Sequence, residues 1–479
     1  MNIFLKHNKA FKWYTNQTIF FKGYFYIDNH FYEKEDAIDF LMKIIEYKEL
    51  LKNINGAFTI IKKEKNSILI INDITRSFPI FYTFYKNNWL FSDDIFLLSK
   101  KTENSNFNSL SEIEFIASNH IYGDKTLLKN VFQTQSSEYL YFERNQIIKR
   151  NFYFNYSSLG DNSTSSYEEL KKQSILAFEN SFMRCFTSMQ NRTAVVPLSS
   201  GFDSRLIAVM LKKHNFENVI CYTYGKKDSF EIKNSRKTAE ELGFDWHFIE
   251  YNEKITGNFL NSNDFKNYVD YAGKLSSMPN LQEYFAVKYL TENNIIPKDA
   301  IFIPGYAGDI LGGSEYLKTI PKHLEHNKIS ELLIDHKMTN YKLSKKHLHK
   351  IEIEKILYCY DTNYQKKIPE TVFDHFNLKE RIAKYIFNSA SFYSFFGYEF
   401  RFPFWDLALL ELFKEVPIQF KRKKKVFDEV LITHYFKPYN VYFENENQTN
   451  IDLVGLQKIK NQLKPFLPTF IKQKKLEKN

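Results

Sequence analysis

The chain has 479 residues, enough for roughly two to four domains of about 150 residues with a core of their own. Its formal net charge is +10, but Lys, Asn, Ile, Phe and Tyr are abundant along the whole chain, so we attribute the charge to composition and expect no nucleic-acid partner. No run reaches about 18 consecutive apolar residues and the first 30 lack a signal-peptide core, which predicts a soluble, cytoplasmic protein.

The first third of the chain is predicted to consist mainly of short strands. Apolar alternation and tight connections mark the ranges 56–61, 68–73, 79–82 and 91–93. A polar, small-residue stretch at 157–166 cannot pack a core, so we predict a linker there. After it, helices and strands alternate, and the helical spacing of apolar residues over 320–387 predicts helices that close over a sheet.

A small-residue loop follows the apolar run 194–198 and precedes the apolar segment 205–211. It reads Ser199-Ser200-Gly201-Phe202-Asp203-Ser204. The order predicts a strand, a loop and a helix, in which backbone N–H groups and the positive helix end converge on a phosphate. Asp203 would repel phosphate, so we predict that it binds the Mg²⁺ that accompanies ATP. No G-K-[ST] follows, which excludes a Walker loop.

A second glycine-rich turn follows the apolar strand predicted at 301–303. Its sequence, from Gly305 to Gly313, is Gly-Tyr-Ala-Gly-Asp-Ile-Leu-Gly-Gly, with Asp309 as its acidic residue. In a parallel sheet both turns lie at the carboxyl edge, where ligands bind. We therefore predict that Asp203 and Asp309 are catalytic residues that share one Mg²⁺.

These segments resemble the asparagine synthetase family. The first loop is similar to the S-G-G-x-D-S loop of the PP-loop ATP pyrophosphatases, and the second turn to G-D-G-x-D-E-L-F-G-G. The stretch 221–225 resembles the strand whose end contacts adenine, and 398–406 resembles the signature E-x-R-x-P-F-L-D. The resemblance implies an α/β fold, with a PP-loop (adenine nucleotide alpha hydrolase-like) parallel-sheet synthetase domain over 167–440.

The resemblance also implies an amino-terminal domain over 1–156 that is an Ntn-hydrolase-like αββα sandwich, similar to the glutaminase half of asparagine synthetases. In that half an amino-terminal cysteine attacks glutamine. Here the chain begins Met1-Asn2, and its cysteines are Cys185, Cys221 and Cys359. Because an asparagine amide cannot replace a thiolate, we predict a degenerate glutamine amidotransferase type 2-like domain without glutaminase activity.

The implied function is an ATP-dependent, AMP-forming amide ligase that adenylates a small-molecule or sugar carboxylate and transfers it to an amine or ammonia. By resemblance, its cofactors are ATP and Mg²⁺, and the metal ligands are Asp203 and Asp309. The ATP-binding residues implied are Leu198, Ser199, Ser200, Gly201, Asp203, Ser204, Tyr224 and Gly305.

Several departures from the family pattern leave alternatives open. Ser200 replaces a glycine, Ile310 replaces a glutamate, and the stretch 441–447 lacks the lysine that the family uses in amide formation, although Lys425 and Lys437 lie nearby in sequence. A noncatalytic binding or scaffolding relative and a PP-loop RNA-modifying enzyme are the alternatives. The basic tail at 441–479 either docks on its own domain or contacts a membrane surface or a partner, and a homodimer is an open alternative for the assembly.

Overall fold

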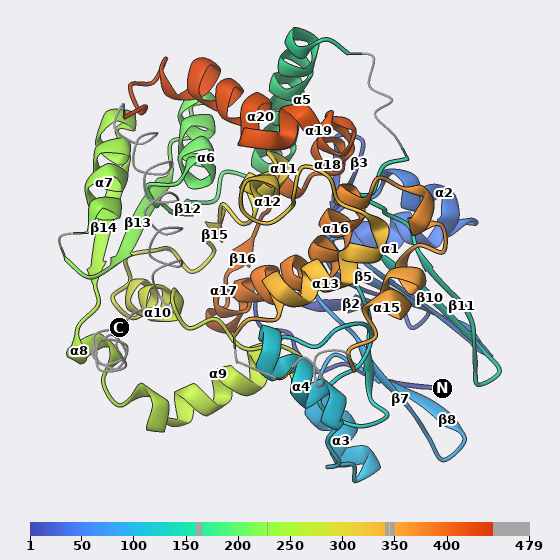
Figure 1. Ribbon diagram of the computed structural model, residues 1–479. Helices are drawn as coiled ribbons and strands as arrows, with labels where there is room; N and C mark the ends of the chain where they lie inside the picture. Colours follow the sequence, from blue (N-terminus) through green and yellow to red (C-terminus); the bar gives the residue numbers. More distant parts are fainter. Residues whose placement is uncertain (160–164, 228, 341–343, 345–349, 444–479) are drawn as a thin grey trace, which may run out of the picture.

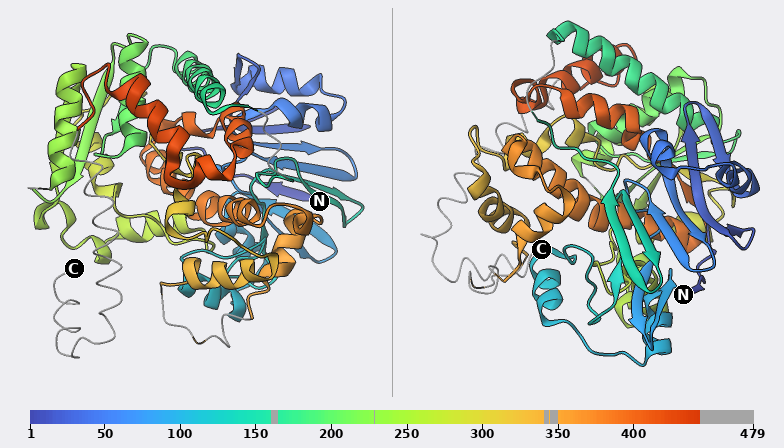
Figure 2. Two further views of the ribbon diagram at one scale, coloured as in Figure 1. Left: turned by 45° about the horizontal axis from the view of Figure 1, so that its top comes forward. Right: turned by 90° about the vertical axis from the view of Figure 1, so that its right-hand side faces the viewer.

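The computed structural model describes residues 1–159, 165–227, 229–340, 344 and 350–443. Part of the predicted linker, 160–164, and nearly all of the predicted basic tail, 444–479, lie outside the described residues. The fold is mixed α/β and consists of two units that lie side by side (Figures 1 and 2). Among the described residues, no helix is both long and apolar enough to cross a membrane.

The first unit contains two sheets. The larger has the strand order β11-β10-β6-β5-β3-β2 with β4 beside β3, and the smaller has the order β1-β8-β7-β9. The strands are β1 (Asn2–Phe4), β2 (Trp13–Thr15), β3 (Ile19–Ile27), β4 (His30–Glu33), β5 (Asn55–Lys63), β6 (Ser67–Asn72), β7 (Phe81–Tyr85), β8 (Asn88–Ser92), β9 (Phe132–Gln133), β10 (Glu138–Glu143) and β11 (Gln146–Phe152). The helices are α1 (Lys34–Met42), α2 (Tyr47–Asn53), α3 (Ile95–Thr102) and α4 (Ser109–Ser118).

Three apolar clusters give the layers of this unit. One joins β5, β6 and β10 to β7 and β8, so the two sheets pack face to face. A second packs α1 and α2 on the outer face of the larger sheet, and a third packs α3 on the smaller sheet. The layer order is therefore helix, sheet, sheet, helix, while the relation to amino-terminal-nucleophile hydrolases stays a prediction.

The second unit is built on a parallel sheet, as the sequence predicted. Its strand order is β14-β13-β12-β15-β16, with every neighbouring pair parallel. The strands are β12 (Ala194–Pro197), β13 (Val219–Gly225), β14 (Asp245–Glu250), β15 (Ile301–Phe302) and β16 (Glu399–Phe400). Because β13 and β15 flank β12 on opposite sides, the strand order reverses at the carboxyl end of β12, a place where ligands bind in open α/β sheets.

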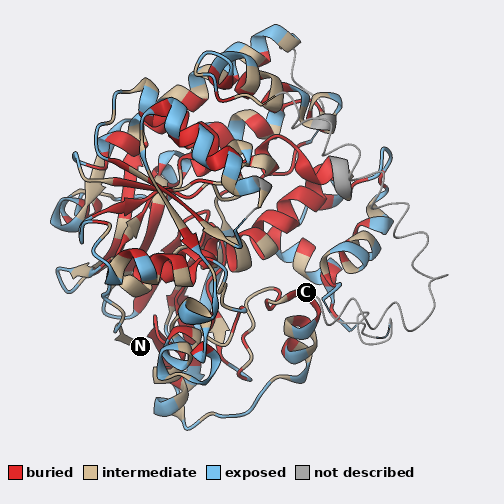
Figure 3. Ribbon diagram, turned by 90° about the vertical axis from the view of Figure 1, so that its left-hand side faces the viewer, coloured by how far each residue is buried: buried red, intermediate tan, exposed pale blue. Residues whose placement is uncertain are grey.

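Helices cover both faces of this sheet, and its strands β12, β13 and β15 are largely buried (Figure 3). One face packs against α5 (Tyr167–Thr187), α6 (Phe202–Lys213), α7 (Phe230–Leu242), α18 (Leu407–Glu415), α20 (Lys425–Val430) and a π-helix (Leu431–Phe436). The other packs against α9 (Asn263–Gly273), α10 (Tyr284–Glu292) and α17 (Ser391–Phe396). Short helices are α8 (Glu253–Thr256), α11 (Gly308–Leu311), α12 (Ser314–Lys318) and α19 (Ile418–Lys421).

The helices expected over 320–387 are present, but most of them do not cover the parallel sheet. They are α13 (His326–Lys337), α15 (Ile353–Tyr360), α16 (Pro369–Asn377) and a π-helix (Leu378–Ile386). Apolar side chains of α13, α15 and α16 form a separate cluster with α4 of the first unit. Among the described residues from 320 to 386, the buried residues that join the core of the parallel sheet are Leu378 and Ile382, and both lie in the π-helix. Helical spacing identified an apolar face but not the surface that it packs against.

The start of the predicted linker is packed rather than extended in solvent. Ser157 and Ser158 are buried, and the backbone N–H of Ser158 donates to Thr371 Oγ1 (3.0 Å). Ile368 N in turn donates to the carbonyl of Ser158 (2.9 Å). Small polar residues can be buried where hydrogen bonds satisfy their backbone groups, which composition alone does not reveal.

Candidate functional site

The loop between β12 and α6 is short and is held by its own serines. Ser199 N donates to Ser204 Oγ (3.0 Å), and Gly201 N donates to Ser199 Oγ (3.1 Å). Pro197 is the last residue of β12, and a proline is tolerated at the end of a strand because its missing N–H does not break the hydrogen bonds within the strand. Ser200 does not have a positive φ, so replacing the usual glycine causes no backbone strain in this loop.

The structure brings Asp203 and Asp309 together from loops about 100 residues apart in sequence. Asp203 lies in the first turn of α6, and its Oδ2 accepts a hydrogen bond from the backbone N–H of Asp309 (2.9 Å). Burial, and next the negative charge of Asp309, raise the pKa of Asp203 to about 7. A divalent cation bound between these two half-buried carboxylates would offset this repulsion.

The donor set near Asp203 suits a magnesium ion that also binds phosphate. Within the described ranges, no group of three or more His, Cys, Asp or Glu side chains is arranged to hold a metal ion. Mg²⁺ commonly uses one or two carboxylates and completes its shell with water and phosphate oxygens. The residues present therefore fit a metal that enters with a nucleotide rather than a permanently caged ion.

Glycines allow the two loops to approach each other. A Cβ atom on Gly305 would lie 2.8 Å from the backbone nitrogen of Ser204, and one on Gly308 would lie 2.8 Å from Asp203 Cγ. Neither approach leaves room for a side chain. The glycine spacing of the second motif is thus explained by its contact with the start of α6.

Lys424 is a charged neighbour of this site that the sequence analysis missed. Its Nζ pairs with Asp428 Oδ1 at 3.1 Å. Although burial lowers the pKa of Lys424, the charges of Asp428, Asp203 and Asp309 raise it above its usual value. Gly313, with φ +93°, allows the segment just before Lys424 to come close, because a Cβ on Gly313 would lie 2.6 Å from the carbonyl oxygen of Lys421.

The lysines considered from the sequence lie elsewhere. Lys425 is exposed, with its Nζ 4.5 Å from the centre of the Tyr167 ring. Lys437 Nζ lies 5.6 Å from the centre of the Tyr442 ring. The run of lysines from 423 to 425 was visible in the sequence. Of Lys424 and Lys425, Lys424, with φ +52°, is the one whose charge interacts with Asp203 and Asp309.

The remaining predicted nucleotide contacts lie at the same edge of the sheet. Leu198 follows β12 and is buried, Tyr224 is near the carboxyl end of β13, and Gly305 follows β15. Thr223 Oγ1 donates to the carbonyl of Leu198 (2.6 Å), which links the first two strands. The Tyr224 ring stacks on Tyr251, with ring centres 5.3 Å apart.

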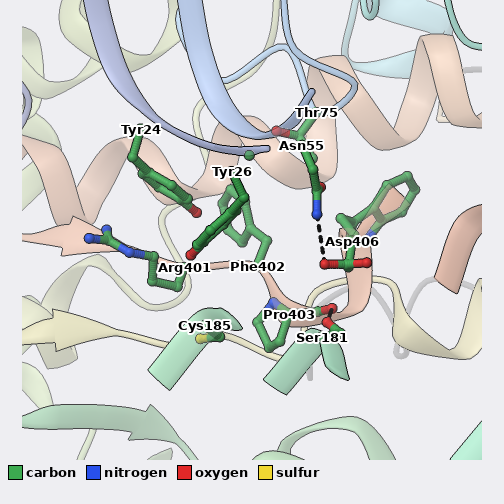
Figure 4. Close-up of a pocket in the computed structure, with 12 residues that line it drawn as sticks. Tyr24, Tyr26, Asn55, Thr75, Ser181, Cys185, Arg401, Phe402, Pro403 and Asp406 are labelled. Atoms are coloured by element: carbon green, nitrogen blue, oxygen red, sulfur yellow. Dashed lines mark hydrogen bonds between the residues drawn. The ribbon is translucent and has the colours of Figure 1, made fainter. Parts of the chain in front are cut away.

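The E-x-R-x-P-F-x-D segment lies between the two units (Figure 4). The Arg401 guanidinium lies 4.1 Å from the centre of the Tyr24 ring, and its Nε donates to Ser188 Oγ (2.8 Å). Asp406 accepts hydrogen bonds from Arg184 (2.7 and 2.8 Å) and from Asn55 Nδ2 (2.6 Å). The cavity that Tyr24, Asn55, Arg401 and Asp406 help to line holds about 20 Å³, room for about one water molecule. The segment therefore joins the two units, and the cavity beside it is too small for a nucleotide.

Comparison with known proteins supports the identification of the first loop. Residues 177–260 match the model of the family described as asparagine synthase. This range includes β12, the serine-rich loop, α6, β13, α7 and β14, and thus half of the proposed metal site. A search of curated proteins gave no match.

Solved structures show weaker likenesses. The NH3-dependent NAD synthetase from Campylobacter jejuni subsp. jejuni NCTC 11168 is 16% identical over 42% of this chain and 86% of that chain, with a TM-score of 0.21. The NMN synthetase from Francisella tularensis is 15% identical over 44% of this chain and 92% of that chain, with a TM-score of 0.22. These TM-scores are too low for the likenesses to carry an argument.

Proposed function

We propose that this asparagine-synthase-related, PP-loop protein is an ATP-dependent, AMP-forming amide ligase for a small-molecule carboxylate and an amine or ammonia. The observation that carries the proposal is the contact of Asp203 with Asp309 at the carboxyl ends of β12 and β15. A carboxylate is a poor acyl donor because it would have to expel oxide. Transfer of AMP to the carboxylate supplies a leaving group, with departure of pyrophosphate.

The proposed nucleotide site follows the edge of the parallel sheet. We assign ATP binding to Leu198, Ser199, Ser200, Gly201, Asp203, Ser204, Tyr224 and Gly305. The loop amides and the amino-terminal end of α6 would stabilise phosphate oxygens. Asp203 and Asp309 would hold Mg²⁺, which when bound neutralises charge on the departing pyrophosphate.

Lys424 supplies positive charge in this proposal. The described part of the stretch where the family uses a lysine, 441–443, contains Val, Tyr and Phe. Lys424 instead supplies a positive charge from the residue before α20. Its ion pair with Asp428 and the charges of Asp203 and Asp309 favour its protonated form. We propose that it exchanges part of this pairing for a phosphate oxygen when ATP binds.

We also propose that the first unit, over 1–156, serves as a scaffold and not as a glutaminase, and that 167–440 form the ATP-binding domain. No cysteine occurs in 1–156, and Cys185 and Cys221 are buried in the second unit. An enzyme without a thiol nucleophile in that unit would take its nitrogen from an amine or from free ammonia.

Exchange of labelled pyrophosphate into ATP tests adenylation without an amine. Amino acids and sugar acids should be screened with the wild type, with Asp203→Asn and with Asp245→Asn, a control at the exposed start of β14. We expect one class of carboxylate to support exchange in the wild type and in the control but not in Asp203→Asn. ATP binding without exchange for any acid would instead favour the noncatalytic alternative, for which Ile310 in place of a glutamate is the supporting observation.

A further inference from the structure

A buried carboxylate lies next to the proposed nucleotide site and has no role in the steps described above. Glu283 precedes α10 and is 6% exposed. Its Oε1 accepts hydrogen bonds from the hydroxyls of Tyr393 (2.6 Å) and Tyr222. Among the described residues, none donates a hydrogen bond to its other oxygen, Oε2.

Further tyrosines surround this carboxylate. The rings of Tyr306 and Tyr393 stack with centres 6.5 Å apart, and the Tyr306 hydroxyl donates to that of Tyr393 (3.4 Å). Burial, and next the charge of Glu283, raise the pKa values of Tyr224, Tyr251 and Tyr306, which places all three within the field of the carboxylate. We call this group the tyrosine cage; it consists of Glu283, Tyr222, Tyr224, Tyr251, Tyr306 and Tyr393.

The tyrosine cage adjoins the two loops of the nucleotide site. Tyr306 directly follows Gly305, whose α-carbon abuts the start of α6. Tyr222 and Tyr224 lie on β13, which pairs with β12 directly before the serine-rich loop. A group bound in the cage would therefore lie beside the carboxyl edge at which we place the adenylate.

When ionised, the carboxylate of the cage has no cationic partner among the described residues. In the part of the chain that the structure describes, no Lys, Arg or His side chain forms an ion pair with Glu283. Burial raises the pKa of Glu283 to about 7, so its ionised form is costly without a cation. A bound ammonium group would pair with the carboxylate, and tyrosine faces attract cations as well. A second carboxylate would be repelled, which separates this site from that of the acid substrate.

We propose that the tyrosine cage binds the ammonium group of the nitrogen donor, either ammonia itself or a primary amine. The inference rests on the proposed amide-ligase function and identifies the chemistry of its second substrate. Glu283 provides the charge, the hydroxyls of Tyr222 and Tyr393 fix its Oε1, and Oε2 faces the ligand. Neutral analogues of the amine lack the ionic contact and bind weakly.

Calorimetry with n-butylammonium chloride as the probe tests the site in the full chain. We expect Glu283→Gln to weaken its binding at least tenfold, and Tyr289→Phe, on the exposed part of α10, to leave it unchanged. Competition by ammonium chloride distinguishes the sources: tighter binding of ammonium indicates ammonia, and tighter binding of butylammonium indicates an organic amine. Equal affinity of the wild type and Glu283→Gln would overturn the proposal.

A measurement on the wild type keeps the test valid if Glu283→Gln does not fold. Butylammonium should bind at least tenfold more tightly than 1-butanol, and equal binding of the two would also overturn the amine site. Pyrophosphate exchange separates this proposal from the preceding one. If pyrophosphate exchange occurs but butylammonium binding does not depend on Glu283, only the amine site is rejected. If butylammonium binding depends on Glu283 but no acid supports exchange, only the ligase function is rejected.

Discussion

Gly305 offers the sharpest test of the contact between the two loops. Its φ is not positive, so an alanine could adopt the backbone conformation, and the consequence of Gly305→Ala depends on space alone. The added Cβ would lie 2.8 Å from Ser204 N, 3.0 Å from Asp203 Cβ and 3.1 Å from the Asp203 carbonyl carbon. These atoms belong to the first turn of α6 and cannot rotate away as a flexible side chain would.

The expected magnitude follows from these distances. Ordinary contact begins at 3.4 Å, so the loop must retreat from α6 by about 0.6 Å, the difference between 3.4 and 2.8 Å. Overpacking of this kind costs about 1–3 kcal/mol of unfolding free energy. A displacement approaching 1 Å in a reacting centre can cost about 100-fold in rate, so we expect pyrophosphate exchange to fall about 10- to 100-fold.

Urea unfolding and pyrophosphate exchange measure the two effects separately. Gly273→Ala is a matched control, because Gly273 ends α9 and its nearest contact would be Pro279 Cγ at an ordinary 3.4 Å. The control should change the unfolding free energy by less than about 1 kcal/mol and leave exchange intact. If Gly305→Ala matched the wild type in both measurements, the close approach of the two loops would be refuted.

Three further outcomes are expected. Lys424→Met should slow pyrophosphate exchange by about 100- to 1,000-fold, since it removes a charge that we propose lies beside the phosphates, while Lys425→Met should match the wild type; equal effects would contradict the assignment. Purified protein should produce no glutamate from glutamine above a heat-denatured control, with or without ATP. Finally, burial raises the pKa of Glu114 to about 7. Between about pH 4.5 and 7 the unfolded chain loses this proton while the folded chain keeps it, so the free energy of unfolding falls as the pH rises. Urea unfolding at pH 5 and pH 8 should show a smaller loss for Glu114→Gln than for the wild type, and an equal loss in both would contradict this sign.

The nucleotide edge was predictable because its signals are local. An apolar run, a small-residue loop and a helix are each encoded within a few residues, and a parallel sheet then places the ends of β12 and β15 side by side. That reasoning brought Asp203 and Asp309 together correctly. The metal and nucleotide roles of these residues stay predictions that the exchange experiments test.

Other features depend on tertiary contacts that leave no local pattern. Glu283 occurs outside any motif, and only the packing of β13, α10 and α17 surrounds it with tyrosines. Lys424 is one of several adjacent lysines, and its left-handed backbone conformation and its interaction with the aspartates follow no local sequence pattern. Charge and periodicity are properties of one segment of sequence, whereas the surroundings of Glu283 and Lys424 depend on which other segments pack against theirs.

Hydrogen bonds between the units show what the first unit contributes to the second. Buried charges of the second unit are satisfied by the backbone of the first: Lys379 Nζ donates to the carbonyl of Ser136 (2.8 Å), and Glu380 Oε1 accepts from Gly123 N (2.9 Å). A hydrogen bond to a charged group typically contributes about 1.5–3 kcal/mol, a sizeable part of the stability of a domain. Loss of the first unit would leave both charges without these partners. The first unit thus contributes to the stability of the second, a role that the predicted degenerate domain would serve without glutaminase activity.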